Sequence, residues 1–250
     1  MRQANLVLHC GSALATREQI ERAATLTPAP TATWHPIPHN DFLNGVESSL
    51  LQSGLSIVSQ AHGLSADGNR YFGLLQIANG ENAADFSLVV GLRNSHDKRF
   101  PAGLVVGASI FICDNLSFSG EVRLARKHTV HVRRDLPQLI DKAVGRLGDL
   151  RRSQEARFAA YRSHLITDQE AHDLVVRSLD ARVIPVTQVP QVLREWRKPR
   201  HREFADRTAW SLFNGFTEVL KGGRLDSLPA RTTALHGLMD LACGLHVSKV

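Results

Sequence analysis

The sequence predicts an α+β protein in which a largely antiparallel sheet of about five strands, from the first half, packs against long helices from the second half. Two observations support this fold class. Apolar residues alternate along segments of region 55–134, and the connections between these segments are too short for helical crossovers. From residue 135 onward, apolar residues recur every three or four positions. Strands in sequence followed by helices are typical of α+β proteins. We therefore expect three regions, 1–54, 55–134 and 135–250, which together can form one domain.

The first region is predicted to hold two short helices separated by a loop. Thr16 and Gln19 have the spacing of a capping box, which indicates a helix that continues to about Thr25. Four prolines within 27–39 favour an extended loop, because each proline lacks an amide donor and restricts the residue before it. Asn40 is then expected to cap a second helix that ends at Gly54.

The second region is predicted to form the sheet. Asp67 and Gly68 mark a tight turn that joins the first two strands into a hairpin. The expected strands cover residues 55–60, 71–78, 86–92, 104–113 and 116–132.

The third region is predicted to be helical. Residues 135–165 form either one long helix or two, because Gly145 and Gly148 weaken the first half of this stretch. Thr167 and Glu170 make a second capping box, which opens a helix that reaches about Leu179. Further helices are expected at residues 189–196, 207–221 and 232–241.

Composition excludes several classes of protein. The chain has 250 residues, of which 43% are hydrophobic and 22% are charged, as in ordinary globular proteins. It contains no apolar run long enough to span a membrane, so we expect a soluble, cytoplasmic protein with no membrane partner. The cysteines Cys10, Cys113 and Cys243 are odd in number and far apart. They therefore favour neither a disulfide framework nor a zinc knuckle, and we expect them to be small buried apolar residues.

The most informative segment is 91–129, which combines turn residues, an apolar run and dense charge. Residues 121–202 contain 18 Lys and Arg against 10 Asp and Glu, in a chain whose net charge is +6. Such an excess either attracts a polyanion or covers a solvated helix surface. If the cations share one face, they can follow successive phosphates of a nucleic acid. The candidate nucleic-acid-binding residues are Arg93, Lys98, Arg99, Arg123, Arg126, Lys127, Arg133, Arg134, Arg151 and Arg152.

Stacking on bases would require aromatic residues beside these cations. Tyr71, Phe72, Phe111 and Phe118 are the aromatic residues near the predicted sheet. Because alternating aromatic positions of a strand usually pack inward, we expect most of them in the core.

A metal site is the competing hypothesis for the same segment. Asp97, Asp114 and Glu121 supply carboxylates that can hold magnesium or manganese together with a neighbouring histidine. The spacing is unfavourable, since His128 and His131 point to opposite faces if they lie on a strand. Asp97 and Asp114 also occupy positions typical of turn residues. No nucleophile elbow or phosphate-binding glycine loop occurs in the sequence. The sequence therefore favours a protein without catalytic residues or a cofactor.

Three stretches of the chain carry a family resemblance. They are GLRNSHDKRFPAGLVVGASIFICDNLSFSGEVRLARKHT (91–129), HGLSADGNRYFGLL (62–75) and TAWSLFNGFTEVLKG (208–222). They resemble the phage- and plasmid-related family catalogued as domain of unknown function 932, over about residues 55–222. The proline-rich segment and the last helix are expected to lie outside the match. Members of this family are found on mobile elements, and the resemblance implies a role in phage or plasmid DNA biology without implying a reaction.

Charge and resemblance together predict an ATP-independent DNA-binding protein of mobile-element origin. Its expected role is single-strand binding or annealing during recombination or replication, and we expect a homo-oligomer because the helical half is amphipathic. Two alternatives remain open. One is a metal-dependent enzyme that acts on nucleic acid or a nucleotide, and the other is an interaction protein that counters a host defence factor.

Overall fold

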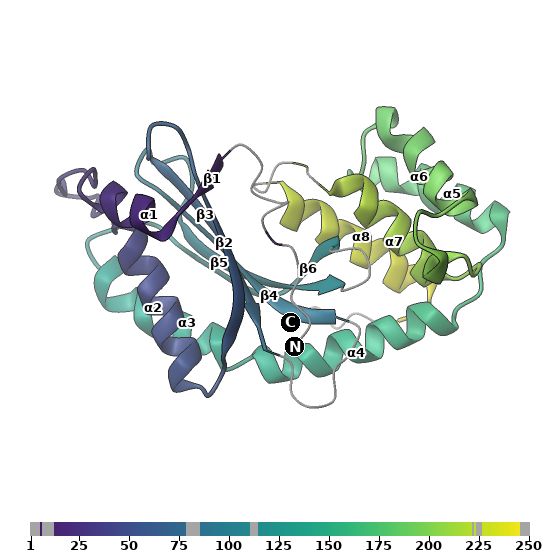
Figure 1. Cartoon of the computed structure of the whole chain (residues 1–250), viewed down its shortest axis with the longest axis horizontal. Helices are drawn as coiled ribbons and strands as arrows, with labels where there is room; N and C mark the ends of the chain where they lie inside the picture. Colours follow the sequence, from purple (N-terminus) through teal and green to yellow (C-terminus); the bar gives the residue numbers. More distant parts are fainter. Residues whose placement is uncertain are drawn as a thin grey trace.

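Six antiparallel strands follow one another across the sheet in chain order in this computed structural model (Figure 1). The structure describes residues 6, 13–78, 86–110, 115–221, 223 and 227–245. The strands are β1 (Leu14–Ala15), β2 (Ile57–Leu64), β3 (Arg70–Ile77), β4 (Phe86–Ser95), β5 (Ala102–Ile110) and β6 (Asn115–Arg126). The predicted fold class is confirmed. The additional strand, β1, has only two residues, which is too short for an alternating pattern to reveal it.

Helices lie at two places around the sheet. On one side, α2 packs against α3 and β4, with α1 beside it, and the helices from α4 to α8 gather at the other end of the molecule (Figure 1). Among the described residues, the helices are α1 (Arg17–Ala24), α2 (His39–Gln52), α3 (Val132–Val144), α4 (Leu147–Ser163), α5 (Asp168–Asp180), α6 (Val189–Arg197), α7 (Ala209–Leu220) and α8 (Leu228–Ala242). None of these helices is both long enough and apolar enough to cross a membrane.

Both predicted capping boxes are confirmed. The amide of Thr16 donates to the side-chain oxygen of Gln19 at 2.7 Å, and the amide of Thr167 donates to the Glu170 carboxylate at 2.7 Å. In each box the threonine hydroxyl accepts from the backbone amide of the partner residue in return. The hairpin turn is also confirmed, with Gly68 at a φ of 68° that suits glycine.

Three predicted boundaries need correction. Asn40 does not cap α2, because the helix already begins at His39 and Pro38 is its N-cap residue. The strand expected at 116–132 ends at Arg126, since the amide of Val132 bonds the carbonyl of Thr129 and turns the chain into α3. Region 135–165 is two helices, which separate at Gly145. Cys113, the expected end of the preceding strand, lies outside the described residues, as does Cys10.

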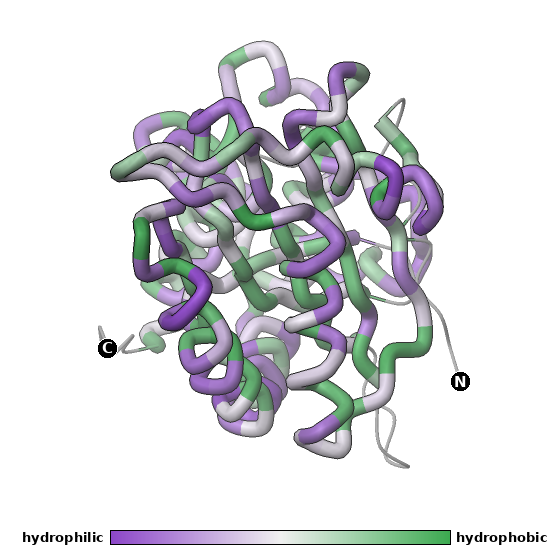
Figure 2. The backbone as a smooth tube through the Cα atoms, turned by 90° about the vertical axis from the view of Figure 1, so that its left-hand side faces the viewer, coloured by the Kyte–Doolittle hydropathy of each residue, from purple (hydrophilic) through white to green (hydrophobic). Residues whose placement is uncertain are grey.

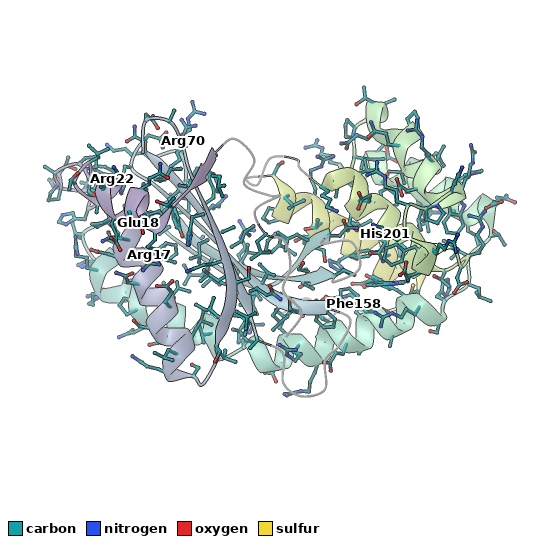
Figure 3. All side chains as sticks on the ribbon, viewed as in Figure 1. Arg17, Glu18, Arg22, Arg70, Phe158 and His201 are labelled. Atoms are coloured by element: carbon teal, nitrogen blue, oxygen red, sulfur yellow. The ribbon has the colours of Figure 1, made fainter. Side chains whose placement is uncertain are left out.

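The buried apolar residues form one cluster that joins the sheet to both groups of helices. Figure 2 shows hydrophobic positions along the central strands and hydrophilic positions along the outer helices and turns. Phe158 of α4 is a centre of this packing, because its ring lies 5.1 Å from that of Phe86 on β4 and 4.9 Å from that of Trp210 on α7 (Figure 3). Aromatic pairs at these separations add packing energy beyond their burial.

Helix α8 covers the open edge of the last strand. The amide of Phe118 on β6 donates to the Thr232 hydroxyl at 2.9 Å, and the carbonyl of Phe118 accepts from the hydroxyl of Thr233 at 3.1 Å. These bonds take the place of a seventh strand at this point, and they satisfy backbone groups that an edge strand otherwise exposes.

We expect Thr232→Val to lower the free energy of unfolding by about 1–3 kcal/mol, because the buried amide of Phe118 loses its acceptor while the shape of the side chain is kept. The matched control is Thr233→Val, which removes one hydroxyl donor from the carbonyl of Phe118. The hydroxyl of Thr232 lies 3.2 Å from the same carbonyl, so this variant should lose less stability. Urea unfolding of both variants measures the difference. Equal losses would contradict the assigned role of Thr232.

Candidate functional site

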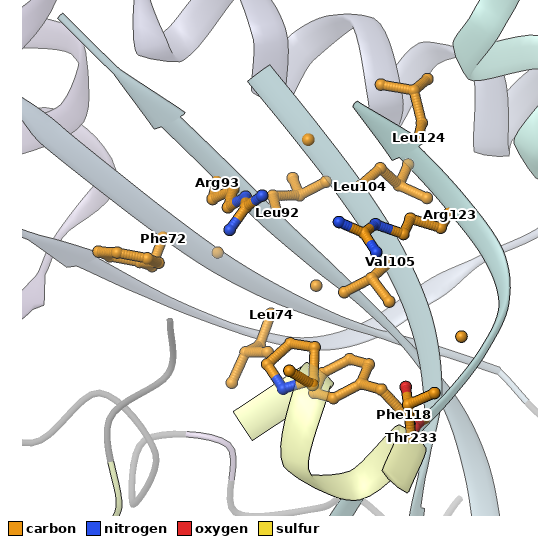
Figure 4. Close-up of a pocket in the computed structure, with 16 residues that line it drawn as sticks. Phe72, Leu74, Leu92, Arg93, Leu104, Val105, Phe118, Arg123, Leu124 and Thr233 are labelled. Carbon is orange, nitrogen blue, oxygen red and sulfur yellow. The ribbon is translucent and has the colours of Figure 1, made fainter. Parts of the chain in front are cut away.

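The strand register brings two arginines to one face of the sheet. Arg93 on β4 pairs with Phe72 on β3 and with Gly103 on β5. Two residues further along β5, Val105 pairs with Arg123 on β6. Directly paired residues point to the same face, and so do residues two apart on a strand. Arg93 and Arg123 therefore lie above the same stretch of β5, and their guanidinium groups extend toward one another (Figure 4).

A pocket of about 400 Å³ lies at these arginines, between the sheet and the start of α8 (Figure 4). This volume falls within the range of small-molecule sites in proteins. We call it the sheet pocket. Its lining residues are Phe72, Gly73, Leu74, Gly91, Leu92, Arg93, Gly103, Leu104, Val105, Phe118, Gly120, Arg123, Leu124, Pro229, Ala230 and Thr233.

Two glycines keep the floor of the sheet pocket open. A Cβ atom at Gly91 would lie 3.1 Å from the ring of Phe118, and one at Gly103 would lie 3.2 Å from Nε of Arg93. The Arg93 side chain therefore crosses β5 in the space that a side chain at 103 would occupy. Glycine inside a strand often marks such a close approach, and here it makes room for a hollow instead of a layer of side chains.

The charged side chains that line the sheet pocket, among the described residues, are Arg93 and Arg123. Among the residues that the structure describes, no Asp or Glu lines the pocket. Arg93 is half-buried and its Cζ lies 5.4 Å from the ring centroid of Phe100, which in turn packs 5.5 Å from the ring of Phe72. Arg123 is exposed. Two guanidinium groups that face the same partly enclosed space can both contact an anion that lies between them.

The remaining lining residues suit the flat or apolar part of a ligand. Phe72 is half-buried and offers an aromatic ring, and Leu74, Val105 and Pro229 add apolar surface. The hydroxyl of Thr233 is a further hydrogen-bonding group in the lining. The sheet pocket can therefore hold a molecule that has both an anionic group and a flat apolar group.

Most of the other predicted cations are paired with carboxylates. Arg126 lies 2.6 Å from Asp135, and Arg134 lies 2.8 Å from the same carboxylate. The two arginines hold the pKa of Asp135 below its usual value, with the hydrogen bond from Arg134 as the largest cause. Arg126 also pairs with Ala102 and not Val105, so it points to the face opposite Arg123. Arg126 and Arg134 therefore do not form a continuous positively charged surface with the sheet pocket.

The last predicted cations lie at separate places on the surface. Lys98 is held 4.8 Å from the ring of Trp34, and Arg99 lies 4.0 Å from Asp97. Arg151 is half-buried, and burial lowers its pKa. Three further side chains are exposed. Arg133 pairs with Asp41 at 3.9 Å, and Arg152 pairs with Asp149. Lys127 lies just beyond the end of β6.

The carboxylates of the metal hypothesis do not meet. Asp97 follows β4 and binds Arg70 at 2.6 Å, near the end of the sheet opposite Phe158 (Figure 3). Glu121 on β6 binds Arg157 of α4 at 2.5 Å. Asp114 lies outside the described residues. Within the described part of the chain, no group of three or more His, Cys, Asp and Glu side chains could hold a metal ion.

A cluster of buried histidines lies under the opposite face of the sheet. The rings of His39 and His96 stack at 3.9 Å with an interplanar angle of 3°. His39 contacts the Gly68 carbonyl at 3.0 Å and the Asn94 amide at 3.0 Å, and His96 contacts the Ile37 carbonyl at 2.9 Å. Burial, together with the neighbouring imidazole of His96, lowers the pKa of His39 to about 3. The cluster therefore connects the proline-rich loop to the sheet in its neutral form.

Sequence reasoning missed several residues of the sheet pocket. Phe72 was expected among core aromatics, but it is half-buried and lines the pocket, whereas Tyr71 and Phe118 are buried as expected. Phe111 lies outside the described residues. Gly91 and Gly103 carried a usable signal, since each interrupts an apolar strand with a residue that packs nothing. Thr233 gave no signal, because only the fold brings α8 to β6.

Comparison with known proteins identifies a family but no individual relative. No curated protein and no solved structure matches the chain significantly. The family model described as a domain of unknown function, DUF932, matches residues 29–240. The match is longer than the 55–222 expected from the sequence motifs, and it includes most of the proline-rich segment and nearly all of α8, both of which were expected to lie outside it. Because the model matches well over half of the sequence, the chain belongs to the DUF932 family.

Proposed function

We propose that the protein binds single-stranded DNA without ATP, and that the sheet pocket is the centre of the binding site. The observation that carries this proposal is the convergence of Arg93 and Arg123 on one pocket that the ring of Phe72 also lines. A nucleotide offers the two features that the pocket suits, an anionic phosphate and a flat base. Guanidinium groups bind phosphate oxygens through paired donors, and aromatic rings stack on bases of any sequence.

The choice of single-stranded over double-stranded DNA follows from the position of the aromatic ring. Phe72 lines the pocket from β3, on the face of the sheet, and only a base with a free face can stack on its ring. An unpaired strand has free base faces, whereas a duplex keeps them stacked. A role in annealing or recombination of phage or plasmid DNA, in the cytoplasm, is the biological setting that we propose for this binding. A homo-oligomer would align several sheet pockets along one strand.

The test is a titration of labelled single-stranded and duplex DNA over a range of salt concentrations. For the double variant Arg93→Gln and Arg123→Gln, we expect at least a tenfold loss of affinity for the single strand. The slope of log affinity against log salt should also fall by about 1.4, since each phosphate contact of a single strand contributes about 0.7.

A matched control keeps the same change in charge away from the sheet pocket. Arg177 on α5 and Arg194 on α6 are both exposed, so Arg177→Gln with Arg194→Gln should leave affinity and slope nearly unchanged. Equal losses in the two double variants would show that only net charge matters. Absence of binding by the unaltered protein at low salt would contradict the proposed function.

A further inference from the structure

Trp34 is a large aromatic residue that the fold keeps partly exposed. All three tryptophans of the chain lie in its described part, and Trp196 and Trp210 are buried whereas Trp34 is half-buried. The carbonyl of Trp34 accepts from the amide of Thr31 at 2.8 Å, and its amide donates to the Thr31 hydroxyl at 3.2 Å. A tight turn of the proline-rich loop therefore fixes this ring at the surface. Tryptophans in such positions are typical of binding surfaces.

Lys98 reaches the same ring from the loop between β4 and β5. Its ammonium nitrogen lies 4.8 Å from the ring centroid of Trp34, and its side chain is exposed. Lys98 has a φ of 62°, a left-handed conformation that is uncommon for a residue with a side chain. The carboxylate of Asp97, which binds Arg70 at 2.6 Å, accepts from the amide of Arg99 at 3.2 Å, so the turn around Lys98 is fixed. Strained positions that the surroundings hold in place are concentrated at binding sites.

This loop also adjoins the sheet pocket. Phe100, two residues after Lys98, packs 5.5 Å from the ring of Phe72, and Cζ of Arg93 lies 5.4 Å from the Phe100 ring. Phe72 and Arg93 line the pocket from β3 and β4, whereas α8 lies beside β6 (Figure 4). Because the Cα atoms of Lys98 and Phe100 are at most about 7.6 Å apart, one short turn separates the pocket from Trp34.

Aromatic rings and cations share the route from the pocket across this loop. A site for a single strand needs both, since the rings stack on bases and the cations contact phosphates. Arg99 adds a cation, because its side chain is 68% exposed and lies 4.0 Å from Asp97. The ammonium of Lys98 covers the Trp34 ring, but an exposed cation–π contact is weaker than stacking of a base. A base can therefore replace the ammonium, which is then able to contact a phosphate.

We propose that a single strand bound in the sheet pocket continues over loop 96–101, with one of its bases stacked on Trp34 and a phosphate on Lys98. This inference rests on the proposed function, and it adds a second contact region for the same strand. It also gives Trp34, which contributes nothing to the buried core, a role in binding.

The experiment uses an oligothymidylate of about 16 nucleotides, the upper end of the usual range of single-strand site sizes. Tryptophan emission and the anisotropy of a labelled strand are followed in separate titrations. We expect the strand to quench the emission, because Trp34 is the tryptophan that a base can reach. Trp34→Leu should abolish the quenching and lower the affinity at least about fivefold. Trp34→Phe should keep most of the affinity without the quenching, since it keeps a ring.

A pair of lysine variants tests the phosphate contact without altering the ring. Lys98→Gln should lower the slope of log affinity against log salt by about 0.7, the contribution of one phosphate contact of a single strand. Lys198, at the end of α6, is also exposed, and Lys198→Gln should leave the slope unchanged. An unchanged slope in Lys98→Gln would contradict the contact between Lys98 and a phosphate.

The outcomes separate this inference from the proposed function. Unquenched emission, or unchanged affinity in Trp34→Leu, would overturn the inference, whereas the proposed function would stand if Arg93→Gln with Arg123→Gln still weakens binding. A loss in Trp34→Leu that Trp34→Phe does not recover would contradict stacking on the ring. Absence of binding by the unaltered protein at low salt would overturn both proposals.

Discussion

Lowering the pH from 6.5 to 5 is expected to remove on the order of 5 kcal/mol from the free energy of unfolding, because several histidines must stay neutral in the fold. Burial lowers the pKa of His39 to about 3, and it lowers the pKa of His62 and His128 to about 4. His39 is fully buried, and the other two are 5% exposed. Neighbouring charges contribute as well, since Arg17 lowers the pKa of His62 while Glu47 raises it.

The direction of this effect follows from which state binds more protons. In the unfolded chain these imidazoles take up protons below about pH 6.5, whereas the folded protein does not protonate them until about pH 4. Each histidine therefore costs about 1.4 kcal/mol per pH unit within this window, and stability falls as the pH falls. Carboxylates whose pKa is lowered, such as Asp97 and Asp135, lose their contribution only below the usual carboxylate range. The histidines and the carboxylates therefore affect stability in separate pH ranges.

Urea unfolding between pH 7 and 4.5 measures this dependence. His128 is the residue to replace, because its ring nitrogens are buried and form no hydrogen bond within the described structure. His128→Leu should reduce the slope of stability against pH by about one proton, or about 1.4 kcal/mol per pH unit. His131→Gln alters an exposed neighbour and should leave the slope unchanged. An unchanged slope in His128→Leu would show that His128 is not a neutral buried residue.

Replacing Arg157 with methionine is expected to lower the free energy of unfolding by about 3–5 kcal/mol, because the buried carboxylate of Asp240 loses its charged partner. Arg157 of α4 binds Asp240 of α8 at 2.9 Å and Glu121 of β6 at 2.5 Å. Its side chain is 10% exposed and that of Asp240 is 2% exposed. Tyr161 donates to Asp240 at 2.6 Å, and burial together with this carboxylate raises the pKa of Tyr161. Loss of Arg157 would therefore leave a buried negative charge with one neutral donor.

The matched control is Arg177→Met. Arg177 binds Asp173 at 2.8 Å on the surface of α5, where both side chains are more than half exposed. Exposed pairs of this kind contribute about 0.3–0.5 kcal/mol. Thermal and urea unfolding of the two variants should therefore differ several-fold in the loss of stability. The double variant Arg157→Met with Asp240→Asn should recover part of the loss, since it removes the uncompensated charge. A loss for Arg157→Met as small as that for Arg177→Met would contradict the assigned role.

The fold was largely predictable because its signals are local. The capping boxes at Thr16 and Thr167, the turn at Gly68 and the change of period near residue 135 each depend on a few neighbouring residues. Boundaries failed where a proline or a local turn ended the pattern, as at Pro38 and at the turn before Val132. An alternating pattern continues past Arg126 although the strand ends there.

The site was less predictable, because charge in a sequence says nothing about which carboxylates lie nearby in space. Arg93 and Arg123 were among the candidate residues, but nothing in the sequence separated them from Arg126 and Arg134, which bind Asp135. The face of the sheet on which Arg123 lies depends on strand register, since a shift of one residue would send Arg123 to the other face. The pocket itself depends on the missing side chains of Gly91 and Gly103, which no count of charges reveals.

The edge contact between α8 and β6 has a consequence for how the chain is made. All neighbouring strands of the sheet are also neighbours in sequence, so the meander can assemble hairpin by hairpin as the ribosome releases it. Thr232, which serves the amide of Phe118, leaves the ribosome only after α3 to α7 have been synthesised. Until then the outer strand has unsatisfied hydrogen-bonding groups, and a nascent chain in that state is open to pairing with another copy.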